Sequence, residues 1–255
     1  REFSDELFLL FATRKGLVKK TALSAYGNIR AVGLNAINIR EGDELIDVRV
    51  TTGDAEVILG TRSGMAIRFA EADARPIGRA TSGVRGINLS GSDEVVGMVT
   101  LHRPDTTLLV VTEGGMGKRT PVDAYRLQQR GGKGVINMRT GPKTGMVVTI
   151  KSVVGTDELM FITRNGVVNR QRVEEIRKIG RATQGVRLVN LDQGDLVVDV
   201  ARVIPEDADE MEEAEAVPGM VDGLEAGDPE PGGSLDDPAS GEELEPSPDT
   251  LTEAE

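Results

Sequence analysis

Apolar and polar residues alternate along residues 1–204 in short runs that recur four times. The four aligned segments cover residues 7–50, 56–99, 107–150 and 159–203. Each segment opens with an apolar run, turns at a Thr-x-x-Gly sequence, and continues as a short strand, a brief irregular or helical connection and two further strand-like runs. Four short strands in about 50 residues is the size of one β-propeller blade. We therefore predict an all-β, propeller-like domain of four four-stranded blades over residues 1–204.

The turns between the first two strands of each segment carry a glycine at the same place. These glycines are 48, 51 and 51 residues apart: Gly16, Gly64, Gly115 and Gly166. A tight hairpin puts one residue at positive φ, which glycine adopts without strain. A basic residue follows each turn at constant spacing, and these four side chains are candidates for contacts with a polyanion: Lys20, Arg68, Arg119 and Arg170.

A second motif, rich in Arg and Gly, lies about 15 residues beyond each turn. It reads Gly-Arg-Ala-Thr-Ser-Gly-Val-Arg-Gly at 78–86, Gln-Gln-Arg-Gly-Gly-Lys-Gly at 128–134 and Gly-Arg-Ala-Thr-Gln-Gly-Val-Arg at 180–187. In the first segment it is shortened to Arg-Ala-Val-Gly at 30–33. Two of its positions recur at intervals of 51 residues, one held by Arg79, Arg130 and Arg181, the other by Gly83, Gly134 and Gly185.

The composition fits sheets packed through aliphatic side chains. Aromatic residues make up 3% of the chain, so Val, Ile, Leu and Thr must supply the core. Trp is absent, which excludes the Trp-Asp signature of WD40 blades. No long helical period occurs, which argues against α/β folds and helical bundles.

Charge divides the chain into a basic body and an acidic tail. The net charge of −12 hides the fact that residues 205–255 hold 19 acidic and no basic residues, so residues 1–204 carry +7. The tail holds 7 of the 11 prolines and lacks periodicity, and we predict that it is disordered and either solubilising or regulatory. A basic body favours a polyanionic partner, although a solvated basic face without a partner has the same composition.

Several kinds of chemistry are excluded or poorly supported. The chain has no Cys, and its one histidine, His102, lies in a polar stretch where we expect it on the surface. Tyr26 and Tyr125 occupy matching places in two repeats, which favours a structural role over a nucleophilic one. The glycine-rich 131–134 stretch lacks the Gly-Lys-Ser/Thr ending of a nucleotide-binding loop. No apolar run is long enough to cross a membrane and no signal peptide is visible, so we expect a cytoplasmic protein with no membrane partner. The residue types and spacings above give no catalytic pair or metal site, so we expect a non-catalytic segment that binds no metal.

The Arg- and Gly-rich motif suits phosphate binding. Glycines allow the backbone to approach phosphate closely, and neighbouring amides can form an anion-binding concavity. Arg130 and Lys133 flank such glycines, and the planar guanidinium adds bidentate contacts. Recurrence every 51 residues would set equivalent cationic loops along one edge of the blades, forming a curved positive track. A track read by phosphates needs no aromatic stacking, and the low aromatic content argues against a single-strand platform.

The quoted motifs resemble a known family, the C-terminal domains of DNA gyrase A proteins. Residues 128–134 resemble the seven-residue gyrase A box, although Gln129 stands where a basic residue is usual. The other Arg- and Gly-rich stretches, and Lys118-Arg119-Thr120, look like the degenerate versions of neighbouring blades. The resemblance covers residues 1–204 and adds an acidic tail of a kind that the family often carries.

The resemblance implies a β-pinwheel, in which blades exchange strands, that wraps duplex DNA so that the whole enzyme introduces negative supercoils. It implies that these are the last four of six blades, with two blades and the catalytic part upstream. Partners would be the rest of gyrase A, and gyrase B, in a heterotetramer, and ATP with magnesium would be used by gyrase B. The residues it marks for DNA contact are Gln128, Gln129, Arg130, Gly131, Gly132, Lys133, Gly134, Arg79, Arg85, Arg181 and Arg187, besides the four basic residues after the turns.

Two alternatives remain. The C-terminal domain of the corresponding topoisomerase IV protein shares the blade architecture and bends DNA, but usually lacks an intact box. A propeller with repeats of the regulator-of-chromosome-condensation type would bind protein instead of DNA. Salt dependence of binding to random duplex DNA separates this last class from the first two.

Overall fold

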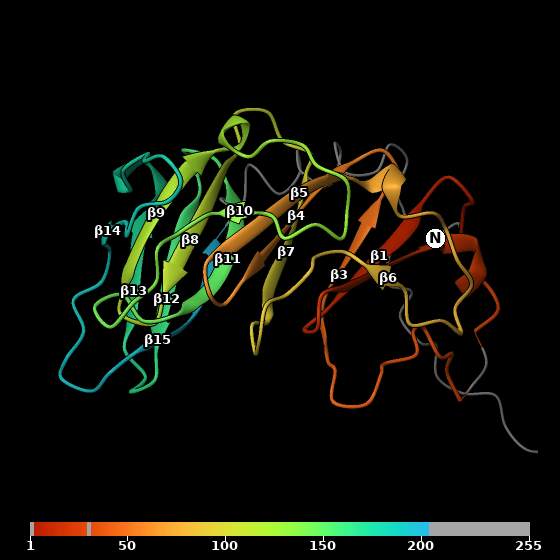
Figure 1. The fold of residues 1–255 in the computed structure, drawn as a ribbon, viewed down its shortest axis with the longest axis horizontal. Coiled ribbons are helices and arrows are strands. Elements are labelled where there is room, and N and C mark those ends of the chain that lie inside the picture. The colour runs from red at the N-terminus through yellow and green to blue at the C-terminus, as the bar shows by residue number, and fades with distance from the viewer. Residues whose placement is uncertain (1–2, 30–31, 204–255) are drawn as a thin grey trace, which may run out of the picture. The chain divides into compact units, whose positions relative to one another are not determined.

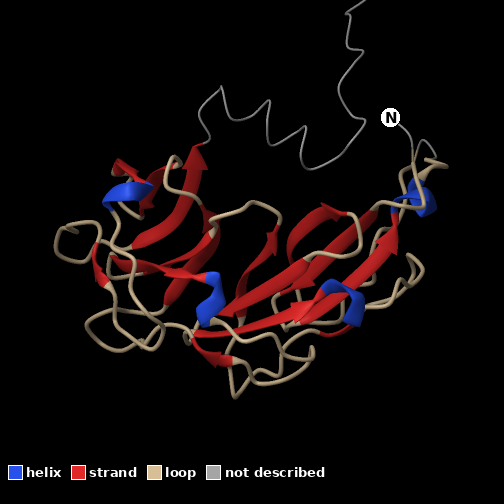
Figure 2. Cartoon of the chain, turned by 90° about the horizontal axis from the view of Figure 1, so that it is seen from above, coloured by secondary structure: helices blue, strands red, loops and turns tan. Residues whose placement is uncertain are grey.

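The structure is a computed structural model that describes residues 3–29 and 32–203. Within them the fold is all-β, and the helices are four short 3-10 turns (Figures 1 and 2). No helix in this part of the chain is long and apolar enough to span a membrane. The predicted disordered acidic tail, residues 205–255, and residues 30–31 of the shortened first motif lie outside the described residues.

The last three repeats contain the same elements in the same order, and the described part of the first lacks the short third strand. The first holds β1 (Phe8–Thr13), β2 (Leu17–Ala22), the 3-10 helix η1 (Leu23–Tyr26) and β3 (Leu45–Thr51). The second holds β4 (Glu56–Thr61), β5 (Met65–Ala70), η2 (Glu71–Asp73), β6 (Val84–Arg85) and β7 (Val95–Leu101). The third holds β8 (Thr107–Thr112), β9 (Met116–Pro121), η3 (Val122–Ala124), β10 (Val135–Ile136) and β11 (Val147–Val153). The fourth holds β12 (Glu158–Thr163), β13 (Val168–Arg172), η4 (Val173–Glu175), β14 (Val186–Arg187) and β15 (Val197–Val203).

The Thr-x-x-Gly sequences form the hairpin turns between the first two strands of each repeat, as predicted. All four turn glycines have φ between +72° and +91°, where a side chain would be strained. In the first turn the Gly16 amide donates to the Thr13 carbonyl oxygen at 2.9 Å. The Thr13 hydroxyl oxygen accepts from the Leu17 amide at 3.1 Å, which explains the threonine. The threonine of the motif therefore accepts the hydrogen bonds that hold the turn, with its carbonyl oxygen and with its hydroxyl oxygen.

Consecutive repeats exchange a short strand. The first three sheets have the orders β3-β1-β2-β6, β10-β5-β4-β7 and β11-β8-β9-β14. Each has one edge strand from the following repeat, which is β6 in the first sheet, β10 in the second and β14 in the third. In the second sheet Val135 pairs with Ala66, and a Cβ on the preceding Gly134 would stand 2.3 Å from the Ala66 carbonyl oxygen. Only glycine permits this approach. The strand exchange confirms the expected β-pinwheel.

The fourth sheet differs from the expectation of four strands per blade. Among the described residues it has three strands, in the order β13-β12-β15. The physical reason is the exchange itself, because the fourth strand of a sheet comes from the next repeat and no further repeat follows in this part of the chain. Val167 and Val168, at the place where the other sheets accept a strand, are 49% and 53% exposed.

The hydrophobic core lies between consecutive sheets. One cluster joins the first two repeats through Leu10, Val57, Ile67 and Met98. Two others join the second repeat to the third and the third to the fourth in the same way. Most of these residues are aliphatic, as the composition predicts, and the two middle sheets are covered on both faces because each packs against two neighbours.

Candidate nucleic-acid interface

The Arg- and Gly-rich motifs form loops held on the preceding repeat; we call residues 78–83, 129–134 and 180–185 the box loops. The third-repeat loop begins where the Gln128 amide donates to the Arg68 carbonyl oxygen of β5, at 2.9 Å. It ends where β10 pairs with the other end of β5. The loops of the second and fourth repeats are fastened to β2 and β9 in the same way. Each box loop thus bridges two anchor points on a neighbouring strand.

Backbone hydrogen bonds join each box loop to the motif of the previous repeat. The Gly131 amide donates to the Gly86 carbonyl oxygen at 2.6 Å, and the Asn88 amide donates to the Gly132 carbonyl oxygen at 2.9 Å. The fourth repeat repeats this arrangement against the third, since Ala182 donates to Asn137 at 3.0 Å and Arg139 donates to Thr183 at 2.9 Å. The structure therefore brings the three box loops together along one edge of the successive sheets, as the 51-residue spacing predicts. One amide expected to face phosphate, that of Gly131, is used internally.

The arginines of the box loops are held by backbone carbonyls of the preceding repeat. Arg130 donates from Nε to the Asp73 carbonyl oxygen at 2.8 Å and from Nη1 to the Arg85 carbonyl oxygen at 3.1 Å. Arg181 donates in the same way to the Ile136 carbonyl oxygen at 3.1 Å. Arg130 and Arg181 are half-buried. A guanidinium has five N–H donors, so these bonds orient it and leave donors for an oxyanion.

The remaining motif residues differ in exposure. Lys133 and Gln129 are exposed, and Gln128 is half-buried with its side-chain nitrogen lacking a partner among the described residues. Arg79 is half-buried, while Arg85 and Arg187, at the ends of the exchanged strands β6 and β14, are exposed. The exposed cations are therefore spread over three successive repeats.

The structure corrects the expectation for two of the four basic residues after the turns. Lys20 is 4% exposed and lies 3.5 Å from Glu71 of the next repeat. Arg119 is 7% exposed and donates to the carbonyl oxygens of Ile176 and Glu174, at 2.6 Å and 3.1 Å. These side chains point into the junction between repeats, where a phosphate has no access.

Arg68 serves the same junction, and Arg170 does not. Arg68 pairs with Glu56 and donates from Nη1 to the carbonyl oxygens of Val122 and Tyr125, at 3.1 Å and 3.0 Å. Arg170 is exposed and pairs with Glu158. Burial therefore excludes Lys20 and Arg119 from direct DNA contact, and such contact stays a prediction for Arg68 and Arg170.

Sequence reasoning missed two lysines that lie under box loops. Lys19 and Lys118 are both 0% exposed. Lys118 donates from Nζ to the carbonyl oxygens of Asn137 and Gly180, at 2.8 Å and 2.6 Å. Lys19 donates to those of Ala36 and Arg79, at 2.5 Å and 2.8 Å. The recurrence of Lys before the basic residue in the first and third repeats is the signal that could have found them.

The tyrosines and the histidine are placed as expected. Tyr125 is 0% exposed, its hydroxyl donates to Asn137 Oδ1 at 2.6 Å, and burial raises its pKa. Tyr26 is buried, and its hydroxyl donates to the Ala36 carbonyl oxygen at 3.2 Å. His102 is exposed. Each tyrosine hydroxyl therefore bonds to the segment that follows the Arg- and Gly-rich motif of its own repeat. Across residues 3–29 and 32–203, no group of three or more His, Asp or Glu side chains is arranged to hold a metal ion.

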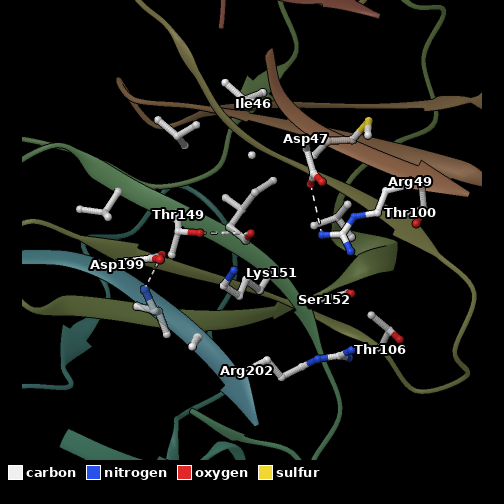
Figure 3. A pocket seen from close by; sticks show the side chains of 18 of the residues that line it. Ile46, Asp47, Arg49, Thr100, Thr106, Thr149, Lys151, Ser152, Asp199 and Arg202 are labelled. Carbon is white, nitrogen blue, oxygen red and sulfur yellow. Dashed lines mark hydrogen bonds and ion pairs between the residues drawn. The ribbon is translucent and has the colours of Figure 1, made fainter. Parts of the chain in front are cut away.

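A cavity of about 770 Å³ is lined by the last strands of the repeats, β3, β7, β11 and β15 (Figure 3). Arg49 Nη2 lies 3.2 Å from Asp47 Oδ2, and Arg103 Nη2 lies 3.0 Å from Asp157 Oδ1. These pairs neutralise charge within the cavity wall. The cavity is therefore a weaker candidate for a polyanion than the box loops.

Ala182 occupies a left-handed backbone conformation that a glycine holds at the same place of the third repeat. Its φ is +54°, and Gly131, at the same place of the third repeat, has φ +81°. We expect Ala182→Gly to stabilise the fold by about 0.5–1 kcal/mol, because relief of left-handed strain exceeds the entropy that glycine adds. Ala80→Gly is the matched control, since Ala80 is not among the residues with positive φ. Denaturant unfolding measures both, and equal destabilisation of the two variants would contradict the strain argument.

Four successive segments of the chain, residues 8–52, 55–101, 106–153 and 157–204, match the family described as DNA gyrase C-terminal domain, beta-propeller. The chain belongs to this family. The matched segments follow the four repeats and contain all three box loops.

Relatives agree with this membership. The DNA gyrase A protein of Staphylococcus aureus (strain MRSA252) is 47% identical over 223 residues, which are 87% of this chain and 25% of the relative. The gyrase A protein of Staphylococcus epidermidis (strain ATCC 12228) is 46% identical over 205 residues, 80% of this chain and 23% of the relative. The chain thus spans about a quarter of the length of these gyrase A proteins.

Solved C-terminal domains share the fold. A crystal structure of the C-terminal domain of DNA topoisomerase IV aligns with a TM-score of 0.76 at 27% identity, covering 80% of this chain and 64% of that one. A structure of the DNA gyrase A C-terminal domain aligns with a TM-score of 0.71 at 25% identity, covering 80% and 68%. Four repeats of this gyrase-type fold therefore correspond to about two thirds of those solved domains.

Proposed function

We propose that this chain binds duplex DNA without sequence specificity through its box loops, bends and wraps it, and so supports negative supercoiling by a DNA gyrase. The observation that carries the proposal is the series of backbone hydrogen bonds that joins each box loop to the segment just after the box loop of the previous repeat. Cationic loops at equal intervals suit a regular phosphate backbone. A surface of this kind binds phosphates and sugars without reading bases.

The proposed contacts come from the box loops and the exchanged strands. They are the loop residues Gln128, Gln129, Arg130, Gly131, Gly132, Lys133 and Gly134, with Arg79, Arg85, Arg181 and Arg187 from the other two repeats. The Arg130 guanidinium, fixed by two carbonyl oxygens, is pre-organised for phosphate because its orientation is set before DNA arrives.

The activity of the whole enzyme lies beyond this chain. We propose that the chain works with the rest of a gyrase A protein and with gyrase B in a heterotetramer, in the cytoplasm at the nucleoid. ATP and magnesium would act in gyrase B, and this segment would take no part in the chemistry. Its contribution is to hold a curved DNA segment so that strand passage has one direction.

The rival candidate is a topoisomerase IV domain, which the TM-score of 0.76 to such a structure favours. The 47% identity to a gyrase A protein and the near-complete box favour gyrase. Relaxation of closed circular DNA in the presence of the chain separates the two. Wrapping leaves supercoils after the protein is removed, whereas bending alone leaves none.

Salt dependence of binding tests the proposal itself. With six proposed phosphate contacts from Arg79, Arg85, Arg130, Lys133, Arg181 and Arg187, the log-affinity for random duplex DNA should fall with log-salt with a slope of about −5. Fluorescence anisotropy from ~50 to ~300 mM salt measures this slope on two unrelated sequences. A slope near zero would favour a protein-binding propeller, and unequal slopes for the two sequences would point to base readout.

A further inference from the structure

Lys19 and Lys118 lie directly beneath box loops. The second-repeat box loop is held on β2 of the first repeat at two points: Pro76, before the loop, forms a β-bridge with Lys20, and β6, after the loop, pairs with Val18. The loop therefore passes over the residue between these points, Lys19. In the third repeat, β14 pairs with Gly117 and the corresponding bridge is at Arg119, so the loop spans Lys118. Each ammonium group uses two donors on carbonyl oxygens from two consecutive repeats.

Both ammonium groups are buried without an ion-pair partner among the described residues. Burial, and secondarily the nearby Arg79 and Arg181, lower the pKa of Lys19 and of Lys118 to about 8. Both therefore remain mainly protonated at pH 7. A buried charge without a carboxylate partner is costly. The carbonyl partners of Lys118 already accept other hydrogen bonds, Asn137 from Ala182 and Gly180 from Thr183. Within the part of the chain that the structure describes, Lys19 has besides its carbonyl partners only the Phe11 ring, whose centre lies 5.2 Å from Nζ. Stability of the free protein alone does not account for these lysines.

The same strand position in the second repeat is apolar. Ile67 lies beneath the third-repeat box loop, where its Cδ1 is 3.6 Å from the place that a Cβ on Gly132 would occupy. Ile67 is also fully buried. Each box loop therefore rests on one buried side chain. This side chain is a lysine beneath the second-repeat and fourth-repeat loops and an isoleucine beneath the third-repeat loop.

The surface charge of the loops varies in the opposite sense. The box loop of the third repeat holds two basic residues, Arg130 and Lys133, while those of the second and fourth repeats hold one each, Arg79 and Arg181, and no box loop holds an acid. The difference arises because Lys133 has uncharged equivalents in the other two loops. A buried lysine lies beneath each of the two loops with fewer charges. With it, every box loop is associated with two cations.

We propose that Lys19 and Lys118 are DNA-binding cations supplied from beneath the box loops, which replace the surface charge that these two loops lack. The proposal rests on the DNA-binding function proposed above. Each ammonium acts without touching phosphate, since a charge within a low-dielectric wall is screened less than a surface charge. Its bond to the loop carbonyl also polarises that peptide unit. DNA phosphates in turn supply the compensation that the free protein lacks.

Relocating the charge tests the proposal in the 255-residue chain. Lys118→Met keeps the shape of the side chain and removes its charge. We expect about a tenfold loss of duplex affinity at ~50 mM salt, and a log-log salt slope shallower by up to about 0.9. Adding Gln184→Lys, at the place that Lys133 holds in the third repeat, should restore both. Lys151→Met is the matched control for charge loss, because Lys151 lines the cavity of the last strands (Figure 3).

Stability separates this role from a structural one. We expect the melting temperature of Lys118→Met to equal or exceed that of the unmodified chain, since a buried charge is removed. Wild-type affinity in Lys118→Met, or failure of Gln184→Lys to restore binding, would overturn the proposal. If Arg130→Ala and Lys133→Ala also left binding unchanged, the box-loop function itself would be wrong, which is a different result.

A measurement on the unmodified chain keeps the test open if the variants fail to fold. Phosphates near the two lysines should raise the pKa of both. Each lysine is about half protonated at pH 8 in the free protein, so duplex binding at that pH should take up as much as about half a proton per lysine. Among the described residues the groups facing them are Arg79 and Tyr26 at Lys19, and Arg181 and Tyr125 at Lys118; neither tyrosine titrates near pH 8, because burial raises the pKa of both. Calorimetry in two buffers of different ionisation heat reports the uptake. Zero uptake would overturn the proposal.

Discussion

Replacing Arg130 and Lys133 together by Ala is expected to weaken duplex DNA binding roughly two hundredfold at ~50 mM salt, because two phosphate contacts and their released counterions are lost. The log-affinity against log-salt slope should become shallower by about 1.8. The loss should be the same for unrelated duplex sequences, since phosphates carry no base information. Anisotropy titrations with labelled random duplexes measure all three quantities.

The two side chains of this variant differ in what else they do. Arg130 also donates to the carbonyl oxygens of Asp73 and Arg85, so Arg130→Ala removes contacts between repeats as well as a cation. Lys133 is exposed and has no such bonds among the described residues, so Lys133→Ala alone is the cleaner test of charge. Arg49→Ala with Lys151→Ala is the control, because it removes one arginine and one lysine from the cavity-lining strands. Equal losses in the control would mean that net charge alone sets affinity.

Removal of Arg79, Arg85, Arg181 and Arg187 together is expected to abolish DNA bending as well as most of the affinity. Smooth bending of a 20–30 base-pair site costs on the order of 1–6 kcal/mol, which one loop with two or three contacts cannot offset. These four arginines lie in the repeats on either side of the third-repeat box loop. That loop is hydrogen-bonded to the segment after the second-repeat loop, and the fourth-repeat loop is hydrogen-bonded to the segment that follows the third-repeat loop. With the outer contacts gone, the remaining loop should hold DNA that stays straight.

Energy transfer between dyes at the two ends of a short duplex measures the bend at saturating protein. We expect the end-to-end distance to return to that of free DNA in the quadruple variant, and to stay short in the Arg49→Ala/Lys151→Ala control. A quadruple variant that still shortens the distance would show that bending comes from another surface, and the wrapping proposal would fail. Reduced affinity with unchanged bending is therefore as informative as a complete loss.

The sequence by itself determined the repeat, the turns and the places of the box loops. A glycine at positive φ has no substitute at a tight hairpin, so Gly16, Gly64, Gly115 and Gly166 mark the turns wherever the sheets lie. Spacing of 51 residues fixed the equivalence of Arg79, Arg130 and Arg181, and equivalent positions in a repeat fold lie on the same edge. These features depend on local conformation and on periodicity, which the chain carries without reference to its neighbours.

Tertiary structure alone decided which cations face outward. The second strand of the first repeat, β2, is buried along both faces, so no alternation of polar and apolar residues distinguishes Lys19 from Lys20. One points under a box loop and the other into the junction with the next repeat, a difference set by the sheet that packs against each face. The exchanged strands were equally hidden, because two residues are too few to show a period. Their pairing, and hence the three-stranded fourth sheet, follows from contacts between repeats that no local pattern encodes.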